Sequence, residues 1–119
     1  MVMVLDVKYR NKTLFVDNKQ LNFDYEVGDA FCVDNNVVFL LKIPYDDETL
    51  KNIYCLSNEC QFLWQVQSVL DAYPKLTIEL PFEGMVLNQD GIISAYDFYG
   101  RNFEIDSCNG KILDYSIVK

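Results

Sequence analysis

The alternation of apolar and polar residues along this chain is the feature that most restricts its fold. In residues 21–25, 62–66 and 76–80, every second side chain is apolar or aromatic. A period of two places these side chains on one face of an extended strand, whereas a helix requires a period of about 3.6. Because the pattern recurs along most of the chain, we expect a fold built almost wholly of strands.

Turn residues divide this pattern into short strands. The expected strands are residues 4–9, 13–16, 20–25, 30–33, 37–43, 52–56, 61–66, 76–80, 84–87, 91–98, 102–106 and 111–118. Such spacing is typical of an antiparallel meander, in a sandwich, an open barrel or partial propeller-like sheets. Residues 68–75 are expected to form a short helix or an irregular loop. No linker interrupts the pattern, so we predict one all-β domain over residues 1–119.

Three local signals add detail to this scheme. Residues 36–42 are apolar on both faces, which predicts a central strand covered on both sides. Asp90-Gly91 is a strong signal for a hairpin turn. Gly28-Asp29 is expected to break the chain before the strand that follows, and Trp64 is expected to anchor the core.

The charge balance and the absence of histidine limit the possible functions. The chain has 10 Lys+Arg against 18 Asp+Glu, a net charge of −8, and no His. An acidic protein repels phosphate backbones and anionic membranes and attracts basic partners. His is the commonest general base and the commonest nitrogen ligand for zinc, iron or copper, so its absence excludes Ser-His-Asp and Cys-His mechanisms in their usual forms. We therefore expect no enzyme activity, cofactor, metal, nucleic acid or membrane binding.

The state of the four cysteines follows from the expected compartment. They are Cys32, Cys55, Cys60 and Cys108, and no C-x2-C pair suggests zinc. Residues 1–6 lack a basic start and the apolar segment of a signal peptide. The longest apolar run, residues 37–41, is far shorter than the ~20 residues that span a bilayer. We expect a cytoplasmic protein whose cysteines are reduced structural thiols.

Two segments of the chain have the form of one hairpin unit. Residues 52–66 and residues 93–105 each read as a strand, a polar turn and a strand. Residues 106–112 add the motif Asp, three residues, Gly-Lys-Ile. These units resemble quinoprotein-type propeller blade repeats. The chain holds two to three blades' worth of sequence, and a ring needs at least about four, so the resemblance implies neither a closed ring nor its cofactor.

The second half of the chain carries a further resemblance. Residues 52–66 contain Asn-Ile-Tyr and Leu-Trp-Gln-Val, and residues 96–112 contain Tyr-Asp, Phe-Glu-Ile-Asp and Gly-Lys-Ile. This combination resembles small acidic β-rich immunity proteins of bacterial contact-dependent or polymorphic toxin systems. The resemblance implies a protein that binds and neutralises one cognate toxin. It transfers no binding residue, and Cys60 stands where the pattern usually has a turn glycine.

Candidate contact residues follow from charge and from residue type. Asp46, Asp47 and Glu48 form an acidic run, and Glu83 follows Pro81; these carboxylates are the expected charged rim. Tyr99 and Arg101 are the expected anchors, since Tyr and Arg are enriched in binding hot spots. Phe98 and Tyr99 should face opposite sides of a strand, which would leave one of them exposed.

These observations favour a non-enzymatic inhibitor, an immunity protein that occludes a basic toxin or nuclease. One alternative is a phage or mobile-element protein that inhibits a nucleic-acid-binding defence enzyme by phosphate mimicry. Another is a small carbohydrate- or ligand-binding β module, which requires an exposed aromatic stripe and a concave pocket.

Overall fold

The computed structural model describes residues 5–44, 47 and 49–117, and these form an all-β fold, as the sequence predicts. The strands are β1 (Val7–Arg10), β2 (Thr13–Val16), β3 (Lys19–Asn22), β4 (Val27–Val33), β5 (Asn36–Leu41), β6 (Ile53–Leu56), β7 (Phe62–Gln65), β8 (Phe82–Leu87), β9 (Ile92–Asp97), β10 (Arg101–Asp106) and β11 (Ile112–Ile117). One short helix, α1 (Val69–Ala72), follows β7, and a 3₁₀ turn, η1 (Gln89–Gly91), joins β8 to β9. No helix among the described residues is long and apolar enough to cross a membrane.

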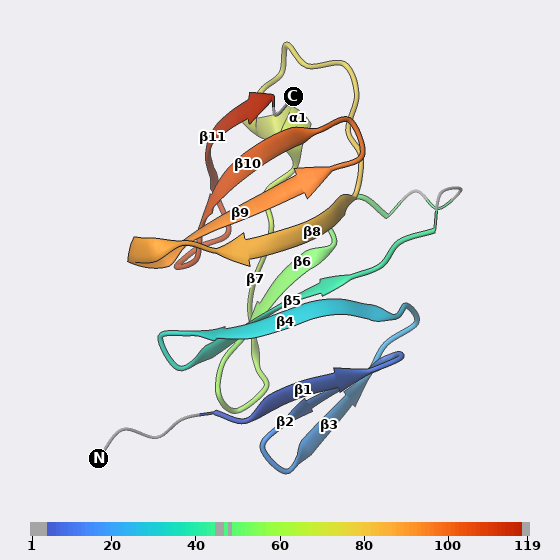
Figure 1. The fold of residues 1–119 in the computed structure, drawn as a ribbon, viewed down its shortest axis with the longest axis vertical. Coiled ribbons are helices and arrows are strands. Elements are labelled where there is room, and N and C mark those ends of the chain that lie inside the picture. Colours follow the sequence, from blue (N-terminus) through green and yellow to red (C-terminus); the bar gives the residue numbers. More distant parts are fainter. Residues whose placement is uncertain (1–4, 45–46, 48, 118–119) are drawn as a thin grey trace.

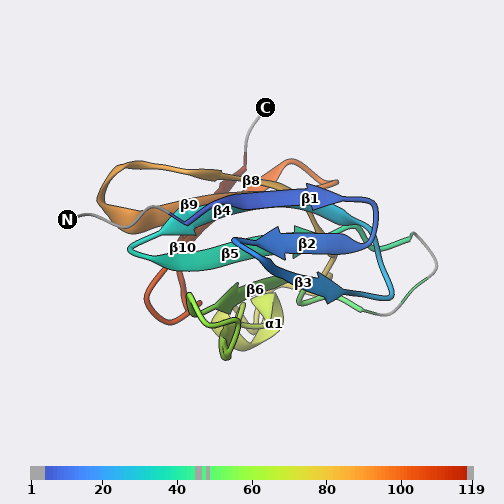
Figure 2. The same cartoon turned by 90° about the horizontal axis from the view of Figure 1, so that it is seen from below.

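The strands form three sheets that follow one another along the chain. Their orders are β1-β2-β3, β4-β5-β6-β7 and β8-β9-β10-β11, and each strand pairs antiparallel with its neighbour in sequence. The sheets are stacked along the long axis of the molecule (Figure 1), and Figure 2 shows the first sheet in front of the central one. Each sheet is therefore a meander, and the two four-stranded sheets have the strand number of a propeller blade.

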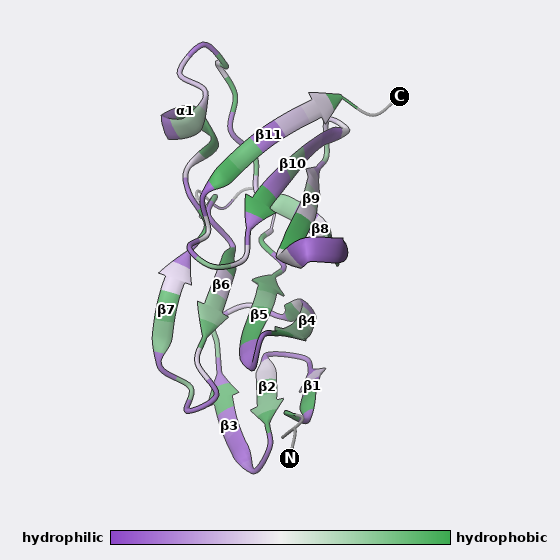
Figure 3. Ribbon diagram, turned by 90° about the vertical axis from the view of Figure 1, so that its left-hand side faces the viewer, coloured by the Kyte–Doolittle hydropathy of each residue, from purple (hydrophilic) through white to green (hydrophobic). Residues whose placement is uncertain are grey.

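The central sheet is covered on both faces. Val38 and Leu40 of β5 belong to the core shared with the third sheet. Val37, Phe39 and Leu41 belong to the core shared with the first sheet. Figure 3 shows β5 and β6 coloured as hydrophobic over most of their length. The prediction of a central strand apolar on both faces is confirmed, and each such side chain contributes about 1.5–3 kcal/mol by its burial.

Asn52 joins the central sheet to the third sheet from a fully buried position. Its side-chain amide donates to the carbonyl oxygens of Leu41 and Phe82, at 2.7 and 2.8 Å. Its side-chain oxygen accepts from the backbone N–H of Phe82 at 2.8 Å. Because a buried amide without partners costs about 1–3 kcal/mol, these bonds fix where the end of β5 meets the start of β8.

Trp64 makes a second connection between the same two sheets. Its indole N–H donates to the carbonyl of Ser107 at 2.9 Å, and the backbone N–H of Gln67 donates to the carbonyl of Gly110 at 2.9 Å. A Cβ on Gly110 would lie 2.4 Å from the Trp64 ring. The ring therefore packs directly against the backbone at position 110, where only glycine leaves enough room. Trp64 is thus a structural anchor, as the sequence indicates.

The β6–β7 turn resembles the β10–β11 turn in detail. Cys60 and Gly110 both adopt left-handed backbone conformations, with φ of 64° and 77°. Each hairpin also has a shift of register just before its turn. The internal repeat therefore relates β6–β7 most closely to β10–β11, one hairpin later than the sequence pairing of residues 52–66 with residues 93–105. Cys60 does occupy a position that suits glycine.

Two predictions of strand positions are wrong. Residues 76–80 form no strand, because their polar groups bond elsewhere: Glu79 accepts from the hydroxyl of Ser68, and the carbonyl of Ile78 accepts from Arg101. Gly28 and Asp29 do not break the chain either. They lie within β4, at a shift of register opposite β5, and a Cβ on Gly28 would come within 2.9 Å of Leu40.

Replacement of Gly110 by alanine tests the packing of Trp64. We expect Gly110→Ala to lower the free energy of unfolding by about 2–4 kcal/mol, through left-handed strain and overpacking together. Gly91→Ala is the matched control, since Gly91 has a similar φ of 73° but meets only the Ser107 hydroxyl, at 3.0 Å. Urea denaturation measures both variants, and equal losses would contradict the role assigned to Trp64.

Candidate functional site

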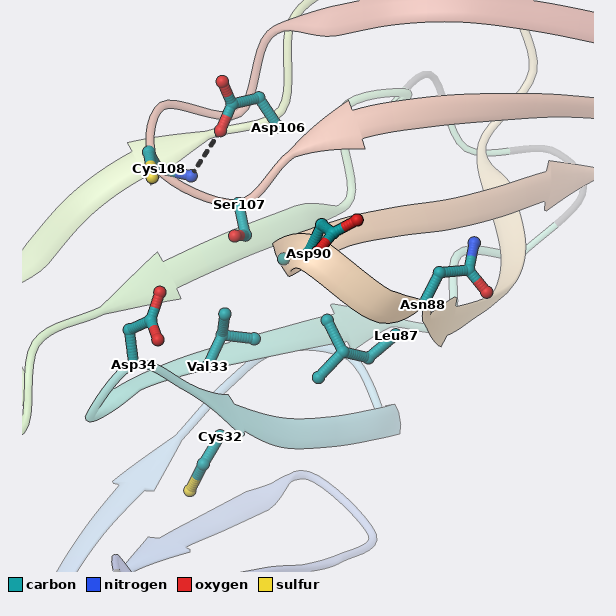
Figure 4. Close-up of a pocket in the computed structure, with 10 residues that line it drawn as sticks. Cys32, Val33, Asp34, Leu87, Asn88, Asp90, Asp106, Ser107 and Cys108 are labelled. Atoms are coloured by element: carbon teal, nitrogen blue, oxygen red, sulfur yellow. Dashed lines mark hydrogen bonds between the residues drawn. The ribbon is translucent and has the colours of Figure 1, made fainter.

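A cleft of about 410 Å³ opens where three turns meet at one end of the second and third sheets. The β4–β5 turn brings Asp34, the β8–β9 turn brings Asp90, and the β10–β11 turn brings Asp106. Figure 4 shows the side chains of the three turns around this space. The lining residues are Cys32, Val33, Asp34, Leu87, Asn88, Asp90, Gly91, Asp106, Ser107 and Cys108.

The carboxylates of the cleft come from residues that also form its turns. Asp34 and Asn35 have φ of 47° and 67°, and Asp90 has φ of 65°. Asp and Asn tolerate this left-handed conformation better than most residues, because their short side chains bond to nearby backbone. The sequence therefore indicates Asp34 and Asp90 as turn-forming residues. Because this local role already accounts for both residues, the sequence gives no sign that they line the same cleft.

Hydrogen bonds hold the turns in place. The backbone N–H of Ser107 donates to the carbonyl of Gly91 at 3.2 Å, which ties the β10–β11 turn to the β8–β9 turn. Asp106 accepts from the backbone N–H of Cys108 at 2.8 Å. The side-chain amide of Asn88 donates to the hydroxyl of Ser94 at 2.5 Å. The wall of the cleft is thus ordered before any partner arrives.

The cleft has a negative potential. Of the described residues that line it, three are Asp and none is Lys or Arg. The charge of Asp106 raises the pKa of the Cys108 thiol, and burial, a hydrogen bond to Asp106 and the charge of Asp34 raise it further. Burial raises the pKa of the Cys32 thiol, with smaller contributions from Asp17 and Asp6. Both thiols therefore favour the protonated, less nucleophilic form.

The carboxylates surround the cleft without converging on one point. Among the described residues, no group of three or more Cys, Asp or Glu side chains is arranged to hold a metal ion. The cysteines are all free thiols, and their exposure ranges from buried at Cys55 to exposed at Cys108. What the cleft offers chemically is a set of hydrogen-bond acceptors and negative charge, which suits the binding of a cation.

The acidic residues proposed from the sequence lie elsewhere. Asp46 and Glu48 fall outside the described residues. Asp47 accepts from the hydroxyl of Tyr25 at 2.6 Å and from the backbone N–H of Thr49 at 2.8 Å, and these hydrogen bonds lower the pKa of its carboxyl. Glu83 is exposed beside a small hollow of about 50 Å³ that Ile43 also lines. Neither Asp47 nor Glu83 belongs to the three-turn cleft.

Phe98 and Tyr99 are both exposed, at 63% and 56%. The sequence led us to expect that strand alternation would bury one of them. That expectation fails because β9 ends at Asp97, and both aromatic residues lie in the turn that follows. Tyr99 keeps the exposure that a contact residue needs.

Arg101 is interior, which corrects the expectation of an exposed anchor. It is 8% exposed and lies on the face of β10 that also carries Phe103. Its Nε donates to Asp97 Oδ2 at 2.7 Å, and its Nη1 donates to the carbonyl of Ile78 at 3.0 Å. Its Nη2 is buried and has no partner within the described residues. Arg101 therefore holds the β9–β10 turn from within.

A separate pocket of about 220 Å³ lies at the other face of the central sheet, and aromatic rings line most of it. Its residues are Phe23, Asp24, Tyr25, Phe39, Leu41, Tyr54 and Phe62. The rings of Phe23, Phe39 and Tyr54 follow one another with centroids 4.9 and 5.3 Å apart, and the Phe62 ring meets Tyr54 edge-on. Phe62 is largely exposed, so part of this aromatic row faces solvent.

The sequence contains part of the information needed to find the three-turn cleft. In a meander, every second turn lies at the same end of the sheet, so the turns at Asp90 and Asp106 could have been placed together. The approach of Asp34 could not, because it depends on how the central sheet stacks on the third.

The chain belongs to the family described as Domain of unknown function (DUF7957), which matches residues 4–117. No curated protein and no solved structure matches the chain. The description of the family names no activity, so any functional assignment depends on the geometry of the site itself.

Substitutions at Arg101 and Tyr99 separate an interior role from a surface role. We expect Arg101→Leu to lower the free energy of unfolding by about 3–5 kcal/mol, because Asp97 would then be buried without its partner. Tyr99→Ala should change it by less than about 1 kcal/mol, since the ring is exposed. Both are measured by urea denaturation, and a small loss for Arg101→Leu would restore Arg101 as a candidate contact.

Alkylation of Cys108 tests the potential in the cleft. Because its pKa is raised, this exposed thiol should react with iodoacetamide near pH 8 more slowly than a cysteine in an unfolded peptide. Asp106→Asn removes the charge and keeps an oxygen for the Cys108 N–H, so alkylation should become at least about threefold faster. Mass spectrometry of the labelled peptide follows the rate. An unchanged rate would show that Asp106 does not set the thiol pKa.

Proposed function

We propose that this protein is a non-enzymatic inhibitor that binds a basic protein one-to-one, as an immunity protein neutralises a cognate toxin or nuclease. The observation that carries the proposal is the cleft lined by Asp34, Asp90 and Asp106, with no Lys or Arg among its described lining residues. The net charge of −8 adds a long-range attraction to the same class of partner.

The electrostatics of the cleft support a fast encounter with such a partner. Opposite charges steer two proteins together and raise the association rate by about 10- to 1,000-fold at low salt. The turns that carry Asp90 and Asp106 are held by hydrogen bonds, so these turns lose little conformational freedom when they bind a partner. Steering sets the rate of association, and contacts at the cleft set the rate of dissociation.

Occlusion follows from the chemistry of nucleases. An enzyme that binds nucleic acid presents cationic side chains to phosphates. An acidic cleft that engages those side chains takes the place of the phosphates and excludes the substrate. The same chemistry supports the second form of the proposal, a phage or mobile-element protein that inhibits a defence enzyme by phosphate mimicry. The genes beside its own separate the two forms, because a toxin gene favours the first and a phage operon the second.

Binding to the products of the two neighbouring genes tests the proposal. We expect one of them to be a basic protein that loses its activity when it forms a one-to-one complex with this chain. The association rate should fall at least about tenfold between about 50 mM and 500 mM salt. It should also fall for Asp34→Asn with Asp90→Asn, two changes that suit the left-handed backbone at these positions.

The matched control is Glu59→Gln with Glu104→Gln, which removes the same charge from exposed positions outside the cleft. An association rate that neither salt nor the two Asp substitutions alter would contradict steering by the cleft. Failure of both gene products to bind, or binding without loss of activity, would contradict the inhibitor itself.

The ligand-binding module remains the alternative that a specific observation favours. The aromatic pocket with Phe23, Tyr54 and Phe62 has the exposed ring and the concave shape that such a module requires. A sugar ring stacks on an aromatic face of this kind, and Asp24 at the pocket could accept hydrogen bonds from its hydroxyls. A glycan screen tests this alternative. A glycan that binds the native chain and does not bind the Phe62→Ala variant would favour it.

A further inference from the structure

We propose that the three-turn cleft is a receptor for one arginine side chain that projects from the surface of the basic partner. The assignment rests on the proposed inhibitor function for the source of the arginine. The preference for a guanidinium group over other cations rests on four features of the cleft, which concern its acceptors, its buried hydroxyl, the spread of its carboxylates and its apolar wall.

The cleft has many hydrogen-bond acceptors and no competing cation. Asp34, Asp90 and Asp106 provide carboxylate oxygens from the three different turns that line the cleft. The amide of Asn88 donates to Ser94, so its side-chain oxygen is left as a further acceptor. A guanidinium group carries five N–H donors in a rigid plane, more than any other side chain. A ligand with many hydrogen-bond donors would satisfy these acceptors.

Ser107 is a largely buried residue whose hydroxyl faces the cleft. The residue is 6% exposed, and its backbone N–H and carbonyl already bond to Gly91 and Trp64. Its hydroxyl has no hydrogen bond within the described residues, and it lines the cleft between the turns of Asp106 and Asp90. An alanine at position 91 would place a Cβ 3.0 Å from this hydroxyl, so Gly91 keeps it uncrowded. The hydroxyl is therefore open to a hydrogen bond from a ligand in the cleft.

The spread of the carboxylates favours a wide cation over a compact one. No three metal-ligating side chains among the described residues gather closely enough for an ion such as calcium. A guanidinium group distributes its charge and its donors over a plane, and it bonds to separate carboxylates at the same time. The volume of about 410 Å³ also leaves room for the aliphatic stem of the side chain.

The apolar wall distinguishes arginine from lysine. Val33 and Leu87 line the cleft beside the carboxylates, and Figure 4 shows them together below the turn of Asp90. The flat faces of a guanidinium group are weakly hydrated and accept apolar contact, whereas an ammonium group is a strongly hydrated point charge. A site that combines carboxylates with Val and Leu therefore costs arginine less desolvation than lysine.

Titration with short peptides tests the cleft without the natural partner. The probes are acetyl-Gly-Arg-Gly-amide, its citrulline analogue, which is isosteric but uncharged, and its lysine analogue. Backbone amide signals in NMR spectra of the ¹⁵N-labelled full chain report binding residue by residue. We expect the arginine peptide to shift the amides of Asp34, Asp90, Ser107 and Cys108, with lysine at least about threefold weaker and citrulline without effect.

Variants show whether the cleft itself is responsible. Asp34→Asn with Asp90→Asn should weaken the arginine peptide at least tenfold, and Glu59→Gln with Glu104→Gln should leave its affinity within twofold. Ser107→Ala should weaken it by a smaller factor and leave the spectrum elsewhere unchanged. Equal shifts with arginine and citrulline, shifts confined to other surfaces, or equal weakening by the two double variants would each overturn the assignment.

The same variants separate this assignment from the inhibitor function. If the basic gene product binds and Asp34→Asn with Asp90→Asn leaves the complex intact, the arginine receptor is wrong while the inhibitor stands. If the arginine peptide binds at the cleft and neither gene product does, the inhibitor is wrong while the receptor stands.

Discussion

The hydrogen bonds of buried Asn52 are the interaction on which the rest of the structure depends. Strand β5 presents apolar side chains to two cores, so its hydrophobic pattern alone does not decide which residues meet the first sheet and which meet the third. Asn52 removes this ambiguity, because its amide bonds to Leu41 in the central sheet and to Phe82 in the third. A slip between the sheets would leave these polar groups buried without partners, at a cost that apolar contacts do not recover.

The candidate site follows from this alignment. With the far end of β5 fixed against β8, the β4–β5 turn extends to the turns before β9 and after β10, and Asp34 reaches the cleft. Trp64 reinforces the arrangement through its bond to Ser107 and its packing on Gly110. The carboxylates therefore stand on a rigid frame, which is the condition under which charged groups bind a partner without first paying for their own ordering.

The charged residues at the two ends of the third sheet differ in whether they are paired. At the β9–β10 turn, Asp97 and Arg101 neutralise one another inside the protein, so neither charge is offered to a partner. At the other end, Asp90 and Asp106 face an open cleft whose lining holds no basic residue among those described. This asymmetry is the reason why our proposal rests on the three-turn cleft and not on the pair of Tyr99 and Arg101 that residue type suggests.

The sequence by itself determined most of the strands and turns and the double burial of β5, because these depend on local alternation and on residues such as Gly91 that suit special backbone angles. It also established the net charge of −8, on which the proposed class of partner rests. Only the tertiary structure decided that Arg101 is interior and that residues 76–80 are not a strand, since both depend on bonds between segments distant in sequence. The cleft is also a product of the tertiary structure, because Asp34 comes to the same cleft as Asp90 and Asp106 only when the central and third sheets stack in one particular register.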